Sequence, residues 1–315
     1  MGLHNLTSYM VSFSDPAVSV QHVAKSYGSS IGVSEASFEV FPGQIVGLLG
    51  PNGSGKTTVM RMIMGLIRPT RGSIEILGLP TRYGQVGNRA RVGYLPGTLG
   101  LYPHMTVEGF LQFLAHMRQV DCRARLEELL ERMELRPGAV IGGLSKGNKQ
   151  KVGVVQALMH SPDVLILDEP TSGLDPLNQR VFESIIREER DKGVAIVLSS
   201  HVMHEVDEVA DRVVILMNGR VVIDDDVLTL KSRIARTLRM EFDHLVDREA
   251  FTEIVGVEHV ATETSDTSCS VTCTVVGSET PVLEVAVKNN VASVFSQEPS
   301  LEEIFLTETG NSHGR

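Results

Sequence analysis

Eight consecutive residues, Gly50–Thr57 with the sequence GPNGSGKT, leave few folds open to this chain. They fit the phosphate-binding pattern G-x-x-x-x-G-K-[ST] and lie between an apolar run, Gln44–Gly50, and a run of helical character, Thr58–Ile67. In a strand, loop and helix of this order, backbone N–H groups and the positive end of the helix dipole bind phosphate oxygens. We therefore expect a nucleoside triphosphate site in which Lys56 balances phosphate charge and the hydroxyl of Thr57 ligates Mg²⁺. The expected phosphate-binding residues are Gly50, Pro51, Asn52, Gly53, Ser54, Gly55, Lys56, Thr57 and Thr58.

A second apolar run, Val164–Asp168, ends in an aspartate and is followed directly by Glu169. Its four apolar residues favour a buried strand, and ligands of α/β proteins collect at the carboxyl ends of such strands. We expect Asp168 to hold Mg²⁺ through water and Glu169 to polarise an attacking water molecule. Together with the phosphate loop, this pair of carboxylates predicts hydrolysis of the nucleotide as well as binding.

The order of the apolar runs predicts the α/β fold class. From Ser19 to about Asp226, strand-like runs alternate with helical stretches, which is the pattern of a mainly parallel sheet covered by helices. Between about residues 100 and 160 the chain has helical character, and we expect a helical subdomain there. Two apolar stripes in this part recur at helical spacing, and we expect both to pack in the core. They are Leu111, Phe113, Leu114 and Met117, and Leu126, Leu129, Leu130 and Met133.

Composition divides the chain into three parts. Residues 1–16 form a lead-in without clear periodicity, 17–226 form the α/β domain, and 227–315 form a small acidic α+β domain. The last part holds 7 basic and 14 acidic residues. Apolar residues alternate with polar ones at strand period in its segments 238–242 and 271–275, so we expect strands there.

Overall composition narrows the possible functions. Hydrophobic residues make up 42% and charged residues 22% of the chain, which excludes a disordered or fibrous protein. The formal net charge of −10 argues against non-specific binding to nucleic acid, because that binding needs many Lys and Arg contacts. Cys122, Cys269 and Cys273 suit neither a disulfide framework nor a zinc site, so we expect reduced thiols. We find neither a signal peptide nor an apolar run of the roughly 18 residues that cross a bilayer, and we expect a cytosolic chain.

Several motifs in a fixed order resemble those of the ABC-transporter ATPases. The segment Leu144–Asn148 (LSKGN) is similar to the signature sequence of that family, in a Lys/Asn variant form. The segment Ser172–Asp175 resembles the D-loop, and His201 stands where the family has its switch histidine. Tyr27 matches the aromatic residue that stacks on adenine. The resemblance covers roughly Val18–Asp226 and implies antiparallel strands at the N-terminal side of the parallel sheet.

The resemblance implies a head-to-tail dimer of two copies of the chain, with two ATP molecules and their Mg²⁺ held between them. Glu169, His201 and Lys56 would act in catalysis, and Thr57 and Asp168 would hold the metal. Each ATP would contact the phosphate loop of one subunit and the signature of the other. The signature residues acting in trans would be Leu144, Ser145, Lys146, Gly147 and Asn148, and the residue linking the two sites would be Asp175. The hydroxyl of Ser145 is also placed to cap the helix that follows it.

One position departs from the family pattern. Gly97 follows the strand-like run Arg91–Pro96, where the resemblance places a Gln or Glu that helps to hold Mg²⁺ and the attacking water. Without that side chain, we expect either slower hydrolysis or a water molecule positioned by Glu169 and His201 alone.

Two segments resemble the bacterial ABC-2-type exporters, whose neighbours include drug and antibiotic efflux ATPases. One is Tyr94–Gly97 together with Leu101–Pro103, and the other is the end of the acidic tail, Ser300–Phe305. Ser300 also has capping-box spacing to Glu303, which predicts a final helix.

The function that this resemblance implies is that of an energy-coupling ATPase at the cytoplasmic face of the cell membrane. Such a chain needs a separate integral-membrane permease, which would dock on the helical subdomain and on the loop Gly97–Pro103. The alternatives are an ABC ATPase that acts on ribosomes or DNA and a domain that binds ATP without cleaving it. The single phosphate loop and the acidic charge disfavour the first, and Glu169 disfavours the second.

Overall fold

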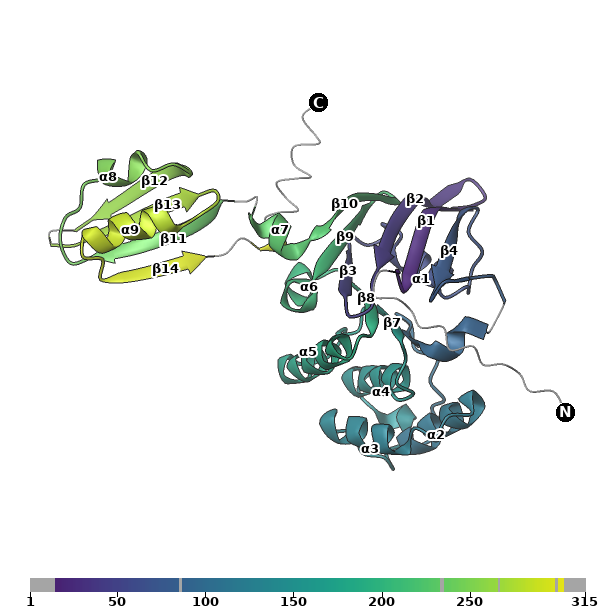
Figure 1. Ribbon diagram of the computed structural model, residues 1–315. Coiled ribbons are helices and arrows are strands. Elements are labelled where there is room, and N and C mark those ends of the chain that lie inside the picture. Colours follow the sequence, from purple (N-terminus) through teal and green to yellow (C-terminus); the bar gives the residue numbers. More distant parts are fainter. Residues whose placement is uncertain (1–14, 85–86, 233–234, 266, 298–299, 303–315) are drawn as a thin grey trace. The chain divides into compact units, whose positions relative to one another are not determined.

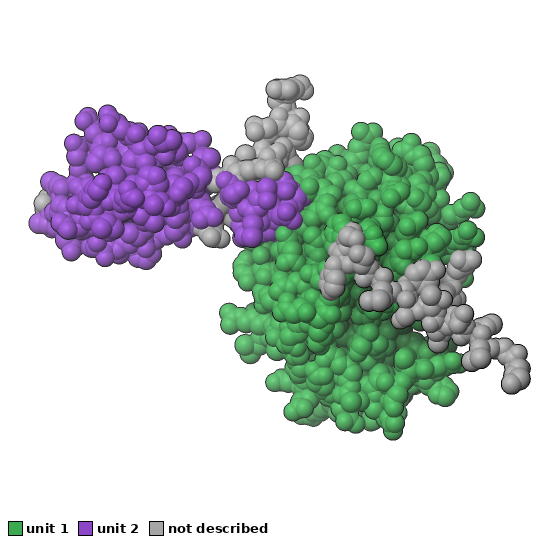
Figure 2. All heavy atoms as spheres, in the orientation of Figure 1, with its two compact units in different colours: residues 1–224 green, residues 225–315 purple. Residues whose placement is uncertain are grey.

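The computed structural model describes residues 15–84, 87–232, 235–265, 267–297 and 300–302. The chain forms two compact units, Met1–Asp224 (unit 1) and Asp225–Arg315 (unit 2), which are coloured green and purple in Figure 2. The expected lead-in, residues 1–16, lies almost entirely outside the described residues. The final helix expected after Ser300 also lies outside them from residue 303 onward.

Among its described residues, unit 1 contains a ten-stranded sheet (Figure 1). The strands are β1 (Val18–Tyr27), β2 (Ser30–Val40), β3 (Ile45–Leu49), β4 (Arg71–Ile76), β5 (Leu79–Pro80), β6 (Val92–Leu95), β7 (Val164–Asp168), β8 (Ala195–Ser200), β9 (Arg212–Met217) and β10 (Arg220–Asp226). Their order across the sheet is β5-β4-β1-β2-β10-β9-β3-β8-β7-β6. Strands β9, β3, β8, β7 and β6 pair in parallel, whereas β2, β1, β4 and β5 pair antiparallel. The predicted α/β class is therefore confirmed.

Helices accompany the parallel strands. They are α1 (Lys56–Ile63), α2 (Val107–Arg118), α3 (Arg123–Arg132), α4 (Lys146–Leu158), α5 (Pro176–Asp191) and α6 (Met203–Val209), with short 3₁₀ helices η1 (Gly87–Arg91) and η2 (Ile141–Gly143). Figure 1 shows α2, α3 and α4 together at the end of unit 1 away from β1 and β2. These three helices lie within residues 100–160.

The central strands are buried along their whole length. Every residue of β3, β7 and β8 is buried, as continuous apolar runs require when both faces of a sheet are covered. In β3, a Cβ at Gly47 would lie 2.1 Å from Cγ1 of Val206 in α6. The glycine therefore lets α6 approach the sheet closely, beside the strand that leads into the phosphate loop.

Helix α1 is shorter than the run Thr58–Ile67 predicted for it. It begins at Lys56 and ends at Ile63. Gly65 then takes φ +61°, and the N–H of Leu66 donates to the carbonyl oxygen of Arg61. A glycine in the left-handed region with such a hydrogen bond ends a helix.

The predicted apolar stripe of α3 is confirmed, because Leu126, Leu129, Leu130 and Met133 are all buried. The stripe predicted for α2 is wrong in two of its members: Phe113 is 41% and Met117 is 66% exposed. The inward face of α2 is instead formed by residues 107, 110, 111 and 114, of which the first three are buried and the last half-buried. That spacing of i, i+3, i+4 and i+7 leaves Phe113 and Met117 at the edge of the covered face.

Ion pairs hold α3 against α5. Arg125 bonds to Glu189, whose side chain is 4% exposed, at 2.6 Å. Arg132 donates two hydrogen bonds to Glu188, each at 2.6 Å, and these bonds hold the pKa of Glu188 at about 2. Bidentate Arg–carboxylate pairs are among the stronger charge-assisted hydrogen bonds. These pairs connect α3, and with it the helices within residues 100–160, to α5.

Unit 2 is a small α+β fold with its own core. Its elements are α7 (Val227–Ser232), β11 (Arg236–Phe242), α8 (Glu249–Thr252), β12 (Val257–Thr264), β13 (Cys269–Val275), α9 (Thr280–Lys288) and β14 (Ser293–Gln297). The strands form an antiparallel sheet in the order β12-β13-β11-β14, so β11 to β14 has the β-α-β-β-α-β arrangement of a split βαβ fold. Both predicted alternating strands are confirmed: residues 238, 240 and 242 of β11 and 271, 273 and 275 of β13 are buried.

Truncation of Phe242 is expected to destabilise unit 2 by about 3–5 kcal/mol. Its ring is 1% exposed and lies 6.1 Å, centroid to centroid, from the ring of Phe251. We expect Phe242→Ala to speed amide hydrogen exchange in β11 and β13, measured by mass spectrometry, while exchange in β3 and β7 stays as in the wild type. Phe295→Ala, at a position 58% exposed in β14, is the matched control. Equal exchange in the two variants would contradict the assignment of Phe242 to this core.

Candidate active site

The phosphate loop joins the end of β3 to the start of α1, and its glycines are required by its shape. Gly50 has φ +144°, and a Cβ there would lie 2.2 Å from the carbonyl oxygen of Leu216. Gly55 has φ +109°, and a Cβ there would lie 2.7 Å from the carbonyl oxygen of Gly32. Only glycine adopts such angles at low cost. Within this described loop, the hydroxyl of Ser54 is buried without a hydrogen-bond partner.

Lys56, the first residue of α1, folds back over its own loop. Its side chain is buried, and Nζ donates to the carbonyl oxygens of Gly50 at 2.6 Å and Pro51 at 3.3 Å. Burial lowers the pKa of Lys56, while the carboxylates of Glu169 and Asp168 act in the opposite direction. A cation is thereby held inside the turn that presents the backbone N–H groups.

Asp168, the last residue of β7, connects the loop to the neighbouring strand. It is 1% exposed. Its Oδ2 accepts a hydrogen bond from Oγ1 of Thr57 at 2.9 Å, and its Oδ1 accepts one from Oγ of Ser199 at 2.7 Å. The carboxylate is therefore oriented from both sides, with a threonine hydroxyl beside it.

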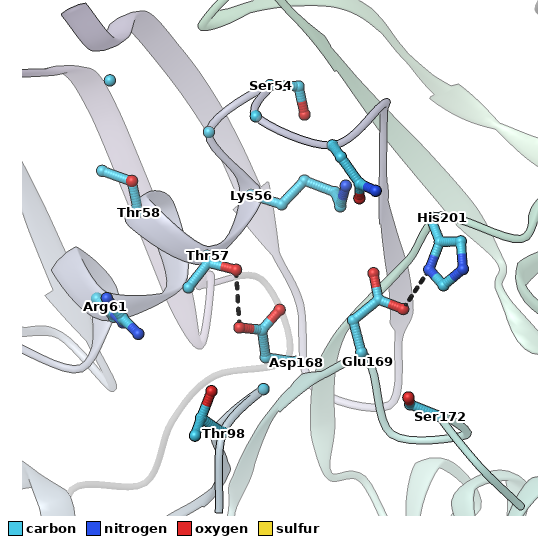
Figure 3. A pocket seen from close by; sticks show the side chains of 15 residues that line it. Ser54, Lys56, Thr57, Thr58, Arg61, Thr98, Asp168, Glu169, Ser172 and His201 are labelled. Atoms are coloured by element: carbon cyan, nitrogen blue, oxygen red, sulfur yellow. Dashed lines mark hydrogen bonds and ion pairs between the residues drawn. The ribbon is translucent and has the colours of Figure 1, made fainter. Parts of the chain in front are cut away.

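Glu169 follows in an unusual backbone conformation, with φ +53°. Its N–H donates to Oγ of Ser199 at 3.0 Å, and its carbonyl oxygen accepts from Nε2 of Gln150 at 3.0 Å. Its Oε2 lies 2.6 Å from Nδ1 of His201. A strained backbone that hydrogen bonds hold on both sides is common at functional sites. Here it directs the Glu169 carboxylate toward His201 (Figure 3).

The phosphate loop and both carboxylates line one cavity of about 460 Å³ (Figure 3). The predicted residues that line it are Asn52, Gly53, Ser54, Gly55, Lys56, Thr57, Thr58, Asp168, Glu169 and His201. The other lining residues are Gly32, Arg61, Gly97, Thr98 and Ser172. The structure thus brings the phosphate loop together with residues of β7 and of the segment after β8, which lie more than a hundred positions further along the chain.

Tyr27 lies beside this cavity rather than in its lining. Its side chain is half-exposed at the end of β1, and the ammonium group of Lys25 lies 5.0 Å from its ring centroid. A Cβ on Gly32, which does line the cavity, would lie 2.9 Å from the ring of Tyr27. The ring is therefore close enough to border a ligand that extends past Gly32.

The signature segment and Asp175 do not reach the cavity of their own chain. Ser145 caps α4, because its hydroxyl accepts a hydrogen bond from the N–H of Asn148 at 3.2 Å. A Cβ at Gly147 would lie 2.5 Å from the carbonyl oxygen of Gly173, so the start of α4 packs tightly on the D-loop. Asp175 caps α5 through the N–H groups of its first turn. The first N–H groups of a helix have no partner within the helix, and the hydroxyl of Ser145 pairs with one of those of α4.

Sequence reasoning missed five contributors to the site. Ser199 bonds to the Asp168 carboxylate and to the N–H of Glu169, and Gln150 bonds to the carbonyl oxygen of Glu169. Gly32, Arg61 and Thr98 line the cavity. Ser199 is opposite Asp168 because β7 and β8 pair in that register. The position of Ser199 directly before Ser200 and His201 could have indicated a site residue. The order of residues does not show that β7 and β8 are neighbours.

The family described as ABC transporter matches residues 33–172. The uncharacterized ABC transporter ATP-binding protein YhaQ of Bacillus subtilis is 38% identical over 219 residues, which cover 68% of this chain and 72% of that protein. The chain belongs to the ABC-transporter ATP-binding proteins. Nod factor export ATP-binding protein I of Paraburkholderia xenovorans is 37% identical over 259 residues, or 77% of this chain and 84% of that protein.

A comparison with solved structures gives the same family. A structure described as the ATP-binding subunit of an ABC transporter has a TM-score of 0.65 and 33% identity, and the match covers 68% of this chain and 92% of that one. This ABC protein is thus an ATPase built on the phosphate-loop fold. Within the described residues, no helix combines the length and apolar character that spanning a membrane requires.

Proposed function

We propose that this ABC ATPase powers the export of a small molecule, such as a drug or antibiotic, through a separate membrane permease. The observation that carries the proposal is the similarity to the Nod factor export ATP-binding protein, which spans 77% of this chain. That share exceeds the length of unit 1, so the similarity extends into unit 2. We accordingly propose that unit 2 is an accessory domain of the exporter and that the protein works at the cytoplasmic face of the membrane.

The cavity residues fit a nucleoside triphosphate with Mg²⁺. The buried, unpartnered hydroxyl of Ser54 lies within a loop of N–H donors, where a phosphate oxygen would accept a hydrogen bond from it. Thr57 and Asp168 supply hydroxyl and carboxylate oxygens, which are the ligands that Mg²⁺ prefers. We assign the metal to these two residues. When bound, Mg²⁺ neutralises negative charge on the phosphate oxygens.

Hydrolysis is assigned to the residues around Glu169. In this proposal, the carboxylate accepts a proton from water as the water oxygen bonds to the γ-phosphorus and the bond to the leaving ADP oxygen breaks. His201, 2.6 Å from Oε2, orients the carboxylate and contacts the γ-phosphate. Lys56 and the loop N–H groups stabilise the charge on the phosphate oxygens.

A second copy of the chain completes the site in this proposal. The start of α4, with Ser145, Gly147 and Asn148, would contact the γ-phosphate bound by the partner subunit. Support comes from its capped N-terminus, which lies outside its own cavity and has the partial positive charge that favours an anion. Asp175, the last residue of the D-loop and the N-cap of α5, would connect the two sites.

The permease is proposed to dock on an apolar surface, the α2 surface, formed by Tyr102, Phe113 and Met117. The three side chains are 54%, 41% and 66% exposed. The ring of Tyr102 lies edge-on to that of Phe113, with 6.2 Å between centroids. Exposed aromatic and methionine side chains are enriched in protein interfaces. The α2 surface lies next to the loop after β6. A permease docked there would be connected through this loop to Gly97 and Thr98 at the cavity.

A pull-down from gently solubilised native membranes tests the proposal. Tagged Glu169→Gln protein with MgATP is expected to retain a polytopic membrane protein in near-stoichiometric amount. Adding Phe113→Ser and Met117→Ser is expected to release that protein, because the apolar contacts are lost. Val255→Ser, at a position 91% exposed in unit 2, is the matched control and should retain it. Recovery of ribosomal or DNA-associated proteins alone would refute transport and leave the ATPase chemistry intact.

A further inference from the structure

The loop after β6 passes directly against the carboxylate of Asp168. A Cβ built on Gly97 would lie 3.0 Å from Oδ2 of Asp168 and 3.4 Å from its Cγ. This is the same oxygen that accepts the hydrogen bond from Thr57. A side chain at position 97 would therefore press on the carboxylate, and Gly97 itself offers no polar side-chain group to the cavity.

The next residue does offer one. Thr98 lines the cavity together with Thr57, Asp168 and Glu169. Its side chain is exposed, and Figure 3 shows its hydroxyl oxygen turned toward the side of the cavity where Thr57 and Asp168 lie. A hydroxyl both donates and accepts hydrogen bonds, so it can hold a water molecule in a chosen orientation.

We propose that Thr98 is a positioning residue for the metal, holding a Mg²⁺-bound water through its hydroxyl. The inference rests on the proposed assignment of Mg²⁺ to Thr57 and Asp168. Mg²⁺ keeps several of its waters when it binds to proteins, and groups that bond to such waters orient the ion. The glycine at position 97 lets the loop run against Asp168, and Thr98 lines the same cavity as Asp168 and Thr57.

Calorimetry on the full-length chain tests the role of Thr98. The probe is adenylyl imidodiphosphate, an uncleaved ATP analogue, titrated once in the presence of EDTA and once in the presence of Mg²⁺. The Kd measured with EDTA, divided by the Kd measured with the metal, shows how much the metal contributes to binding. Thr98→Val, which removes the hydroxyl and keeps the shape, is expected to lower this ratio by about tenfold, as loss of a group orienting a metal ligand does. Its Kd in EDTA should match the wild type, and Thr98→Ser should keep the wild-type ratio.

A Thr57→Val variant separates this inference from the proposed function. If Thr57→Val loses the metal contribution while Thr98→Val keeps it, the role of Thr98 is refuted and the metal assignment stands. If the wild type shows no metal contribution, the metal assignment fails and the role of Thr98 fails with it. An equal loss in Thr98→Ser and Thr98→Val would also refute the inference, because the serine retains the hydroxyl.

Discussion

Replacing Glu169 by glutamine is expected to lower the kcat of ATP hydrolysis by about 10²- to 10⁴-fold, because an amide cannot accept the proton of the attacking water. Glutamine keeps the size of the side chain and can still bond to Nδ1 of His201. The backbone of residue 169 should also stay in place, because Ser199 and Gln150 bond to its N–H and carbonyl groups. The measurement is phosphate release at saturating MgATP, alongside the Kd for ATP, which we expect to change little.

Glu284→Gln is the matched control for this variant. Glu284 is an exposed residue of α9 in unit 2, so the same loss of one negative charge there should leave phosphate release unchanged. A Glu169→Gln protein that releases phosphate at the wild-type rate would show that another group activates the water. The catalytic assignment would then be wrong, although binding of ATP by the loop would be unaffected.

Lys56→Met is expected to weaken ATP binding by about 10- to 150-fold, which corresponds to the roughly 1.5–3 kcal/mol of a hydrogen bond to a charged group. The wild-type ammonium group is buried and bonds to the loop carbonyl oxygens of Gly50 and Pro51. Methionine has a similar length and no charge, so the variant should fold while losing the cation that meets the phosphates. Calorimetric titration with ATP and EDTA measures this effect without a contribution from the metal.

Two comparisons make the Lys56 result interpretable. Lys288→Met removes an equal charge from an exposed position at the end of α9 and should bind ATP as the wild type does. Thermal unfolding of both variants reports whether the fold is intact. A folded Lys56→Met protein with wild-type affinity would contradict the role of Lys56 in phosphate binding.

Much of the site could be predicted because its parts are local in the chain. The glycines lie between β3 and α1, and Lys56 and Thr57 begin α1, so their spacing alone implies a phosphate loop. Asp168 and Glu169 likewise stand at the end of an apolar strand. Ser145 was expected to cap a helix and does so, because capping depends on neighbours only three residues away.

The errors arose where a side chain's surroundings come from distant segments. Phe113 and Met117 fit a helical period as well as the buried residues of α2 do, and only the packing of neighbouring elements decides which side of the helix is covered. Thr98 and Arg61 carry no motif that distinguishes them from other polar residues. They belong to the cavity because the loop after β6 and the second turn of α1 come together beside Asp168.

Spacing along the chain was sufficient to establish the phosphate loop, the carboxylate pair and the alternation of strands and helices, because each depends on interactions over a few residues. The register of β7 against β8, which places Ser199 on Asp168, was decided by tertiary structure. So was the approach of Gly97 to the same carboxylate, against which a side chain at position 97 would press, and the placement of Thr98 at the cavity. These contacts join residues 31 and 71 positions apart from Asp168, and only the packing of the sheet sets their distances.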